Sequence, residues 1–381
     1  MDHLDSAQSH PEEAQTRRSR RAFIATASSG LVGASLVSTG APAQIKASAQ
    51  TDEPSPSALE RIDCQSHLFC PALVERMEAR LEDPIVYRRG DERFVRMDNW
   101  HRKILPNHMD VAAKLASMDR AGIQITALSI NDPGPEWFGK DGVEVARIAN
   151  DYVAGIVTAH PTRFIGLAVL PLPDVQASLA ELDRAVSQLK LRGLLMYTNI
   201  AGRFPDEPEF RPVWAKAAAL NVPVLLHPAK PLTTDVVQGY EMTSSLGNMF
   251  DNTIALTRII MSGMLDELPK LQLVCPHLGG TLPYIVGRID HQTQVLKRGP
   301  KNLTRAPSEY LKQVYLDVVS PWPLGMRLAY DYLGPDRLLF ASDHPLVEPE
   351  LIASALTSLD LPATDSAKIF GGNARRLFRI D

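Results

Sequence analysis

Short apolar runs alternate with helix-length amphipathic segments from residue 61 to the end of the chain, and this alternation constrains the fold most strongly. It predicts parallel strands, because parallel neighbours need long connections that are usually helical. Eight such units favour a closed (β/α)8 barrel over an open doubly wound sheet. The expected strands cover residues 61–64, 124–130, 164–170, 191–197, 222–227, 271–277, 314–319 and 338–343.

A long polar insertion, residues 71–110, separates the first two expected strands and contains Trp100 and several arginines and aspartates. Insertions of this length in a compact domain are commonly functional, so we expect this one to cap the barrel mouth. No glycine-rich phosphate-binding motif follows the first strand, and the sequence therefore gives no support for a nucleotide cofactor. We assign residues 59–381 to one barrel domain.

Polar side chains stand where four of the expected strands end. The first strand leads into Gln65 and His67, and three later strands end at His227, His277 and Asp343. In barrels of this kind the C-terminal strand ends line the active site. A single histidine at a strand end is more often structural, but several polar groups that converge by topology indicate a functional site.

The stretch "RIDCQSHLFCP" at residues 61–71 raises the question of a metal ion. A strand that enters a metal site often ends in His-x-His, because alternate residues share one face and both imidazoles can reach one ion. Here the same spacing is occupied by Gln65-Ser66-His67. This stretch is therefore compatible with a metal site that has one unusual ligand, with a lost metal site, or with no metal site.

Several segments resemble one known family in their order along the chain. The most specific are "PHLGGTLP" (276–283) and "SDHP" (342–345), and they occur with "HPTRFIGLAVLPLPD" (160–174), "VPVLLHPA" (222–229) and "IFGGNARRLF" (369–378). Together they resemble the amidohydrolase superfamily, and within it the branch named for aminocarboxymuconate-semialdehyde decarboxylase. The resemblance covers nearly all of residues 59–381.

The resemblance implies a (β/α)8 TIM barrel of the metal-dependent hydrolase type, with one divalent ion, zinc or manganese, and no organic cofactor. Carried onto this sequence, the family's metal ligands fall on His67, His227 and Asp343, and its acid/base histidine falls on His277. The first family ligand, commonly His and sometimes Glu, falls on Gln65, which is where this chain departs from the pattern. The resemblance also implies a homodimer.

The glutamine does not by itself abolish metal binding. Two histidines and one carboxylate are sufficient for a catalytic zinc, and a site with few nitrogen ligands can also accept manganese. Gln65 would then be a weak neutral ligand or a donor that orients a ligand. Alternatively, Gln65 orients water or substrate and no metal binds. We favour a retained metal, because the other three ligands are all present.

Two reactions fit these residues. The resemblance favours a carboxy-lyase acting on a small aromatic or unsaturated carboxylic acid, with His277 and Asp343 transferring the proton. The alternative is a hydrolase of an amide, ester, lactone or C–C bond that uses metal-activated water. A barrel that binds a ligand without turnover is a third possibility, against which His277 argues. Asn199, just after the fourth strand, and Arg102 in the insertion are candidate substrate contacts.

The first 58 residues are expected to lie outside the barrel. Residues 1–43 have the layout of a twin-arginine-type signal peptide, with "SRRAFI" at 19–24, a weakly apolar run and an Ala-x-Ala site at 41–43. Residues 44–58 are rich in Ala, Ser, Pro and acidic groups, which is typical of a flexible linker. We therefore expect export to the periplasm.

Charge and composition limit the partners. The net charge is −4 and no basic cluster occurs outside the signal segment, so nucleic acid is an unsuitable partner. Three cysteines do not make a disulfide framework. Beyond the signal segment no apolar run is long enough to cross a bilayer, so we expect no stable membrane insertion. A small-molecule substrate remains the expected partner.

Overall fold

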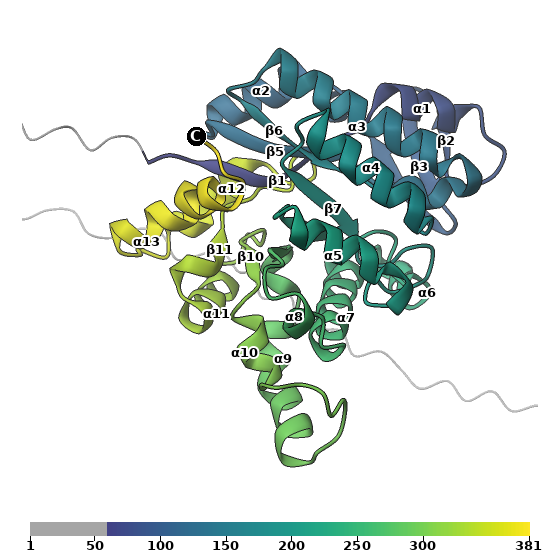
Figure 1. The fold of residues 1–381 in the computed structure, drawn as a ribbon. Coiled ribbons are helices and arrows are strands. Elements are labelled where there is room, and N and C mark those ends of the chain that lie inside the picture. Colours follow the sequence, from purple (N-terminus) through teal and green to yellow (C-terminus); the bar gives the residue numbers. More distant parts are fainter. Residues whose placement is uncertain (1–58) are drawn as a thin grey trace, which may run out of the picture. The chain divides into compact units, whose positions relative to one another are not determined.

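The computed structural model describes residues 59–381, and its centre is an eight-stranded parallel sheet (Figure 1). The strand order is β1-β5-β6-β7-β8-β9-β10-β11. Hydrogen bonds from Cys64 N to Phe340 O (3.0 Å) and from His67 N to His344 O (2.8 Å) join β1 to the segment after β11 and close the sheet. The predicted (β/α)8 barrel is therefore confirmed. The strands are β1 (Ile62–Leu68), β5 (Ile125–Ile130), β6 (Phe164–Ala168), β7 (Gly193–Tyr197), β8 (Val224–His227), β9 (Leu273–Cys275), β10 (Tyr315–Asp317) and β11 (Leu338–Leu339).

Each expected strand corresponds to an observed one, and the differences lie at the strand ends. Strand β1 continues to Leu68, so Gln65 and His67 belong to the strand itself. Its register shifts at a β-bulge between Asp63 and Ser66. Bulges increase local twist and redirect side chains next to active sites. Strand β11 has only two residues, and Asp343 therefore lies in the connection that follows it.

Helices connect the strands, as expected for parallel neighbours. Aspartates cap two of them: Asp110 Oδ1 accepts from Ala112 N (2.8 Å), and Asp174 Oδ1 accepts from Ala177 N (2.9 Å). The helices that follow the insertion are α2 (Val111–Arg120), α3 (Gly142–Ala159), α4 (Val175–Ser187), α5 (Arg211–Ala219), α6 (Thr234–Val237), α7 (Asn248–Met261), α8 (Met264–Glu267), α9 (Leu282–Asp290), α10 (Pro307–Leu311), α11 (Pro323–Leu333), α12 (Pro349–Thr357), α13 (Ala363–Ala367) and α14 (Asn373–Leu377).

The insertion between β1 and β5 has its own structure. It contains α1 (Pro71–Glu78) and a three-stranded antiparallel sheet of β2 (Ile85–Arg89), β3 (Glu92–Met97) and β4 (Trp100–Ile104). Trp100 and Arg102 of β4 reach the wall of the main cavity described below. The insertion therefore contributes two side chains to the wall of this cavity.

The barrel is buried on both faces of its sheet, which explains the near-continuous apolar runs of its strands. All seven residues of β1 are buried, including the four polar ones Asp63, Gln65, Ser66 and His67. Cys64, Cys70 and Cys275 are buried free thiols. Among residues 59–381, no helix has the length and apolar character needed to span a membrane. The predicted signal peptide and linker lie outside the described residues.

Candidate active site

A cavity of about 1050 Å³ opens at the C-terminal ends of the barrel strands. His227, at the end of β8, His277, after β9, and Asp343, after β11, line it. This is the end of a (β/α)8 barrel at which active sites are found. The structure thus brings together the strand-end residues that the sequence singled out.

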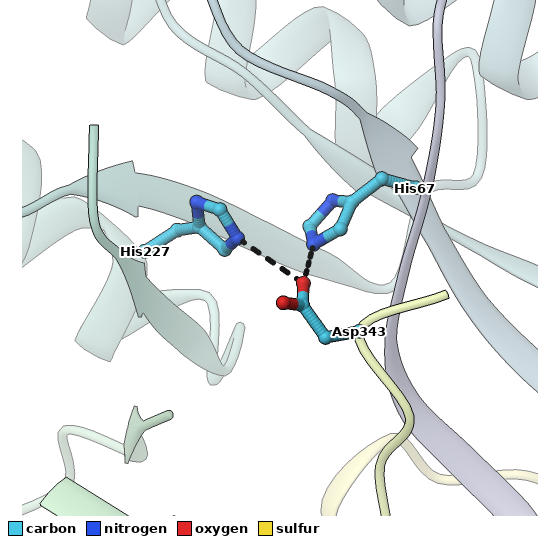
Figure 2. Close-up of side chains that lie close together, drawn as sticks. All are labelled: His67, His227 and Asp343. Carbon is cyan, nitrogen blue, oxygen red and sulfur yellow. Dashed lines mark ion pairs between the residues drawn. The ribbon is translucent and has the colours of Figure 1, made fainter. Parts of the chain in front are cut away.

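His67, His227 and Asp343 converge on one point (Figure 2). His67 Nε2 lies 3.1 Å and His227 Nε2 lies 3.8 Å from Asp343 Oδ1. One ligand atom from each residue lies within 4.8 Å of the other two, and all three residues are buried. In Figure 2 both imidazoles point from their strands toward the carboxylate.

The hydrogen bonds of His67 define its protonation state. Its Nδ1 lies 2.7 Å from Ser129 Oγ and 3.3 Å from the carbonyl oxygen of Ile130. A carbonyl only accepts, so Nδ1 carries the proton and Nε2 presents a lone pair to the site. Burial and the neighbouring His227 lower the pKa of His67 to about 4. At neutral pH this lone pair therefore faces the Asp343 carboxylate, an arrangement that favours a cation between the two groups.

Asp343 is held as the charged form. Burial alone would raise its pKa, but the neighbouring imidazoles of His227 and His277 hold the pKa of this carboxyl well below its ordinary value. Its backbone lies in the left-handed region (φ 59°), which aspartate tolerates better than most residues. Its peptide N–H donates to the carbonyl of Gln65 at 2.9 Å. This bond ties the main chain of Asp343 to β1.

Gln65 lies beside this cluster, with its amide directed at it. Its Nε2 donates to Asp343 Oδ1 at 3.0 Å and lies 3.5 Å from His67 Nε2. Its Oε1 is buried and has no hydrogen-bond partner among the described residues. Rotation of the amide by half a turn would direct the oxygen at the cluster instead. The position thus suits both alternatives for Gln65, a neutral oxygen ligand and a donor that orients Asp343.

The donor set fits a divalent metal ion. Two imidazole nitrogens and one carboxylate form the ligand set of many catalytic zinc sites, and zinc or manganese would be accepted here. Both ring nitrogens of His227 are buried without a partner among the described residues, as is Gln65 Oε1. Buried polar atoms normally have partners, so these unsatisfied atoms support the same fit.

His277 faces the second carboxylate oxygen of Asp343, whereas His67 and His227 face the first. Its Nε2 lies 3.5 Å from Asp343 Oδ2. Asn252 Nδ2 donates to His277 Nδ1 (3.0 Å) and to the carbonyl of Pro276 (3.3 Å). The carbonyl fixes the amide orientation, so Nδ1 accepts and Nε2 carries the proton of the neutral ring. Burial would lower the pKa of His277, but the carboxylates of Asp343 and Asp317 outweigh it and raise that pKa.

Arg102 lines the cavity, but its charge is already compensated. Its Nη1 forms an ion pair with Asp132, and its Nη2 donates to Asn131 Oδ1 at 3.1 Å. The guanidinium also stacks 5.1 Å from the centre of the Trp100 ring. Arg102 can therefore offer hydrogen bonds at the cavity wall, with little net positive charge.

Asn199 does not line this cavity. Its Nδ2 donates to Asp251 Oδ2 (3.0 Å) and to the carbonyl of Lys230 (3.0 Å), which commits the amide to the loops around it. Asn199 borders a second cavity of about 350 Å³. The loop after β7 turns toward Asp251, so the substrate contact expected of Asn199 stays a prediction that the main cavity does not support.

Glu136, in the 3-10 segment Pro135–Asp141, borders the same second cavity. Burial raises its pKa from 4.5 to about 8, and the nearby Asp132 adds to the shift. Its Oε1 and the Tyr197 hydroxyl have no partner among the described residues. A Cβ at Gly134 would collide with both side chains, so a glycine is required there. Glu136 is therefore a buried, protonated acid at neutral pH.

The amidohydrolase family model matches residues 62–380. The chain belongs to the amidohydrolase family. It is 30% identical over 305 residues to the gamma-resorcylate decarboxylase of Rhizobium sp. (strain MTP-10005), covering 76% of this chain and 93% of that protein. It is 26% identical over 292 residues to the 2-amino-3-carboxymuconate-6-semialdehyde decarboxylase of Dictyostelium discoideum, covering 74% and 79% of the two chains.

A solved structure gives a similar result for the fold. The chain superposes with a TM-score of 0.72 and 26% identity on the dihydroxybenzoic acid decarboxylase of Polaromonas sp. JS666, which contains manganese and the inhibitor 2-nitroresorcinol. The match covers 84% of this chain and 97% of that one. The sequence resemblance to the family is thus confirmed over the whole barrel.

Several residues that build this amidohydrolase site were not found by sequence reasoning. Asp317 accepts from the peptide N–H of His277 at 2.7 Å, and its position at the end of β10 was a signal that could have identified it. Asn252 and Ser129 lie within ordinary helix and strand patterns. Lys114 of α2 is buried and donates to Ser66 Oγ (2.6 Å) and to the carbonyl of His344 (2.8 Å). Its position in an amphipathic helix gave no signal for this role.

Proposed function

We propose that this chain is a metal-dependent carboxy-lyase that removes carbon dioxide from a small aromatic or unsaturated carboxylic acid. The observation that carries the proposal is the contact between His277 and Asp343 at the end of a large cavity, beside the cluster of His67, His227 and Asp343. The names of the related decarboxylases support the same reaction class.

His67, His227 and Asp343 would hold the ion, with Gln65 beside them. A bound divalent ion would supply positive charge that attracts the substrate carboxylate and an adjacent oxygen. The three ligands are buried, and the low local dielectric strengthens this attraction relative to water. The manganese in the structure of the related dihydroxybenzoic acid decarboxylase supports the choice of zinc or manganese for this chain.

The proton transfer is assigned to His277 and Asp343. Decarboxylation needs a proton delivered to the ring carbon that bears the carboxylate. The carbon–carbon bond then breaks and carbon dioxide leaves, and the electron pair of the broken bond restores the ring. His277 Nε2 carries a proton and faces both the cavity and Asp343 Oδ2. Asn252 maintains this tautomer. The raised pKa of His277 suits an acid that delivers a proton near neutral pH.

The test is a turnover assay on the zinc- and manganese-loaded protein with a panel of hydroxybenzoic acids and dienoic acids. We expect one carbon dioxide for each acid consumed, and a loss of at least a hundredfold in kcat for His277→Asn. The matched control is His291→Asn, because His291 is exposed. Hydrolysis of an ester, lactone or amide panel without carbon dioxide release would instead establish the hydrolase alternative.

Metal content provides an independent measurement. We expect about one zinc or manganese ion per chain in the purified protein, and its loss from the double variant with His67→Ala and His227→Ala. A protein that stays metal-free in added zinc and manganese would contradict the proposal, whatever its activity.

We also propose export of the full chain through the twin-arginine route. The proposal rests on the "SRRAFI" segment and the Ala-x-Ala site. Cell fractionation should find the wild-type protein in the periplasm and the variant with Arg20→Lys and Arg21→Lys in the cytoplasm. The homodimer that the family resemblance implies is tested by sedimentation of the purified protein.

A further inference from the structure

The main cavity is larger and more apolar than the chemistry at its end requires. Its volume of about 1050 Å³ is at the top of the range of about 300–1,000 Å³ that holds drug-sized ligands. A single-ring acid is much smaller than such a ligand. The cluster that would hold the carboxylate occupies one end of this space. Most of the cavity is therefore available to another part of the substrate.

Apolar side chains form much of the cavity wall. They include Leu278 after β9, Val319 after β10, and Leu346 and Val347 after Asp343, with Leu328 on α11. Apolar walls contribute affinity in proportion to the apolar area that a ligand buries against them. Hydroxyl groups and one amide also line the cavity, so the burial of a polar substituent would be costly only against the hydrocarbon part of the wall.

The cavity also lacks an uncompensated cation for a second acidic group. Arg102 is the one lysine or arginine among the described lining residues, and it is paired with Asp132. A second carboxylate on the substrate would therefore be desolvated without a free positive partner. The part of the substrate that lies beyond the reacting ring is consequently uncharged.

Large apolar side chains continue from the walls to the cavity rim. Tyr284 is 82% exposed, Trp322 is 61% exposed, and Leu328 is 43% exposed, and all three line the cavity. Contiguous exposed apolar side chains commonly mark a place where a ligand or partner binds. Here the rim is continuous with the walls, so one elongated apolar group could contact both.

We propose that the substrates are hydroxylated aromatic acids with one carboxylate and an extended, uncharged apolar substituent on the ring. This inference rests on the proposed function for the placement of the carboxylate. The carboxylate end lies at His227, His277 and Asp343, and the substituent lies along the wall formed by Leu328 and Leu346 toward Trp322.

The test uses nitro isosteres, which keep the planar shape of the carboxylate but cannot lose carbon dioxide. Two series, 2-nitro-3-alkylphenols and 2-nitro-5-alkylphenols from methyl to pentyl, are titrated calorimetrically into the metal-loaded protein. Full burial of each added methylene corresponds to about fourfold in Kd. We expect at least a tenfold decrease in Kd from methyl to pentyl in one of the two series.

Two variants locate the effect. Leu328→Gln, at the cavity wall, should reduce the gain from methyl to pentyl to less than threefold while leaving the affinity for the methyl compound nearly unchanged. Leu351→Gln is the matched control, because Leu351 is 56% exposed on the neighbouring helix α12 and does not line the cavity. It should retain the full gain.

The outcomes separate this inference from the proposed function. The carboxylic acids that correspond to the two nitro series are assayed for turnover. If these alkyl-substituted acids are decarboxylated but neither nitro series gains affinity with chain length, the proposed function stands and the inference is overturned. If affinity increases with chain length but no acid loses carbon dioxide, the apolar subsite stands and the decarboxylase proposal fails. An equal gain in wild type and Leu328→Gln would also overturn the inference, because the alkyl group would then lie elsewhere.

Discussion

Replacing Glu136 with glutamine should change how the stability of the protein depends on pH. The carboxyl group of Glu136 is buried, and its pKa is raised from 4.5 to about 8. The folded state therefore keeps a proton that the unfolded state releases between these two values. The stabilising effect of this proton is complete below pH 4.5 and is lost progressively as the pH rises toward 8. Glutamine has a similar shape and no charge, so the variant lacks this dependence.

The size of the expected stability change follows from the pKa shift of Glu136. Each pKa unit corresponds to 1.36 kcal/mol, and pH 7 lies 2.5 units above 4.5, so ionisation of Glu136 in the unfolded chain costs the wild type about 3 kcal/mol of stability at pH 7. At pH 5 the same cost is below about 1 kcal/mol. We therefore expect Glu136→Gln to unfold at a similar urea concentration to the wild type at pH 5, and at a clearly higher one at pH 7.

The assay is urea unfolding followed by far-ultraviolet circular dichroism at pH 5, 6, 7 and 8. The matched control is Glu75→Gln, because Glu75 is exposed on α1. The urea concentration at which this control unfolds should change with pH in the same way as that of the wild type. Parallel profiles for Glu136→Gln as well would refute the reasoning, since they would mean that Glu136 titrates at the same pH in the folded and unfolded chains.

Three further changes test the site. Gln65→Glu replaces a neutral amide with a charged oxygen ligand, so the Kd for manganese should fall at least tenfold in a competition with a chelator; an unchanged Kd would place this side chain outside the coordination sphere. Lys114→Ala leaves Ser66 Oγ and the His344 carbonyl without their buried donor and opens a cavity, and should destabilise the protein by about 2–4 kcal/mol in urea unfolding. Asn252→Leu removes the bond that fixes the His277 tautomer, and should lower kcat and change its pH profile while KM stays nearly constant; a change confined to KM would contradict this role.

The barrel could be predicted from periodicity and topology, whereas the roles of His67, His227 and Asp343 as metal ligands came from the resemblance to the family. Eight apolar runs fix the strands, and the C-terminal ends of parallel strands meet at one end of a barrel. His67, His227 and Asp343 each stand at such an end, so no side-chain detail was needed to bring them together.

The contacts that the sequence did not reveal depend on side-chain direction and loop path. Asn199 also follows a strand, but its amide is taken up by Asp251, a residue 52 positions later in the chain. The tautomer of His277 depends on Asn252, which belongs to another helix. Such pairs have no signature in the local pattern of one sequence.

The closure of the barrel has a consequence for how the protein acquires its ion. His67 stands on the first strand and Asp343 follows the last, and the seam between these strands contains few backbone hydrogen bonds. A cation bound by both residues would join the first strand to the segment after the last, and its binding energy would stabilise the closed barrel. The site cannot exist until the final strand has been synthesised and docked. Loading would therefore follow closure of the barrel, and a chain cut before residue 338 would lack both the closed barrel and the ion.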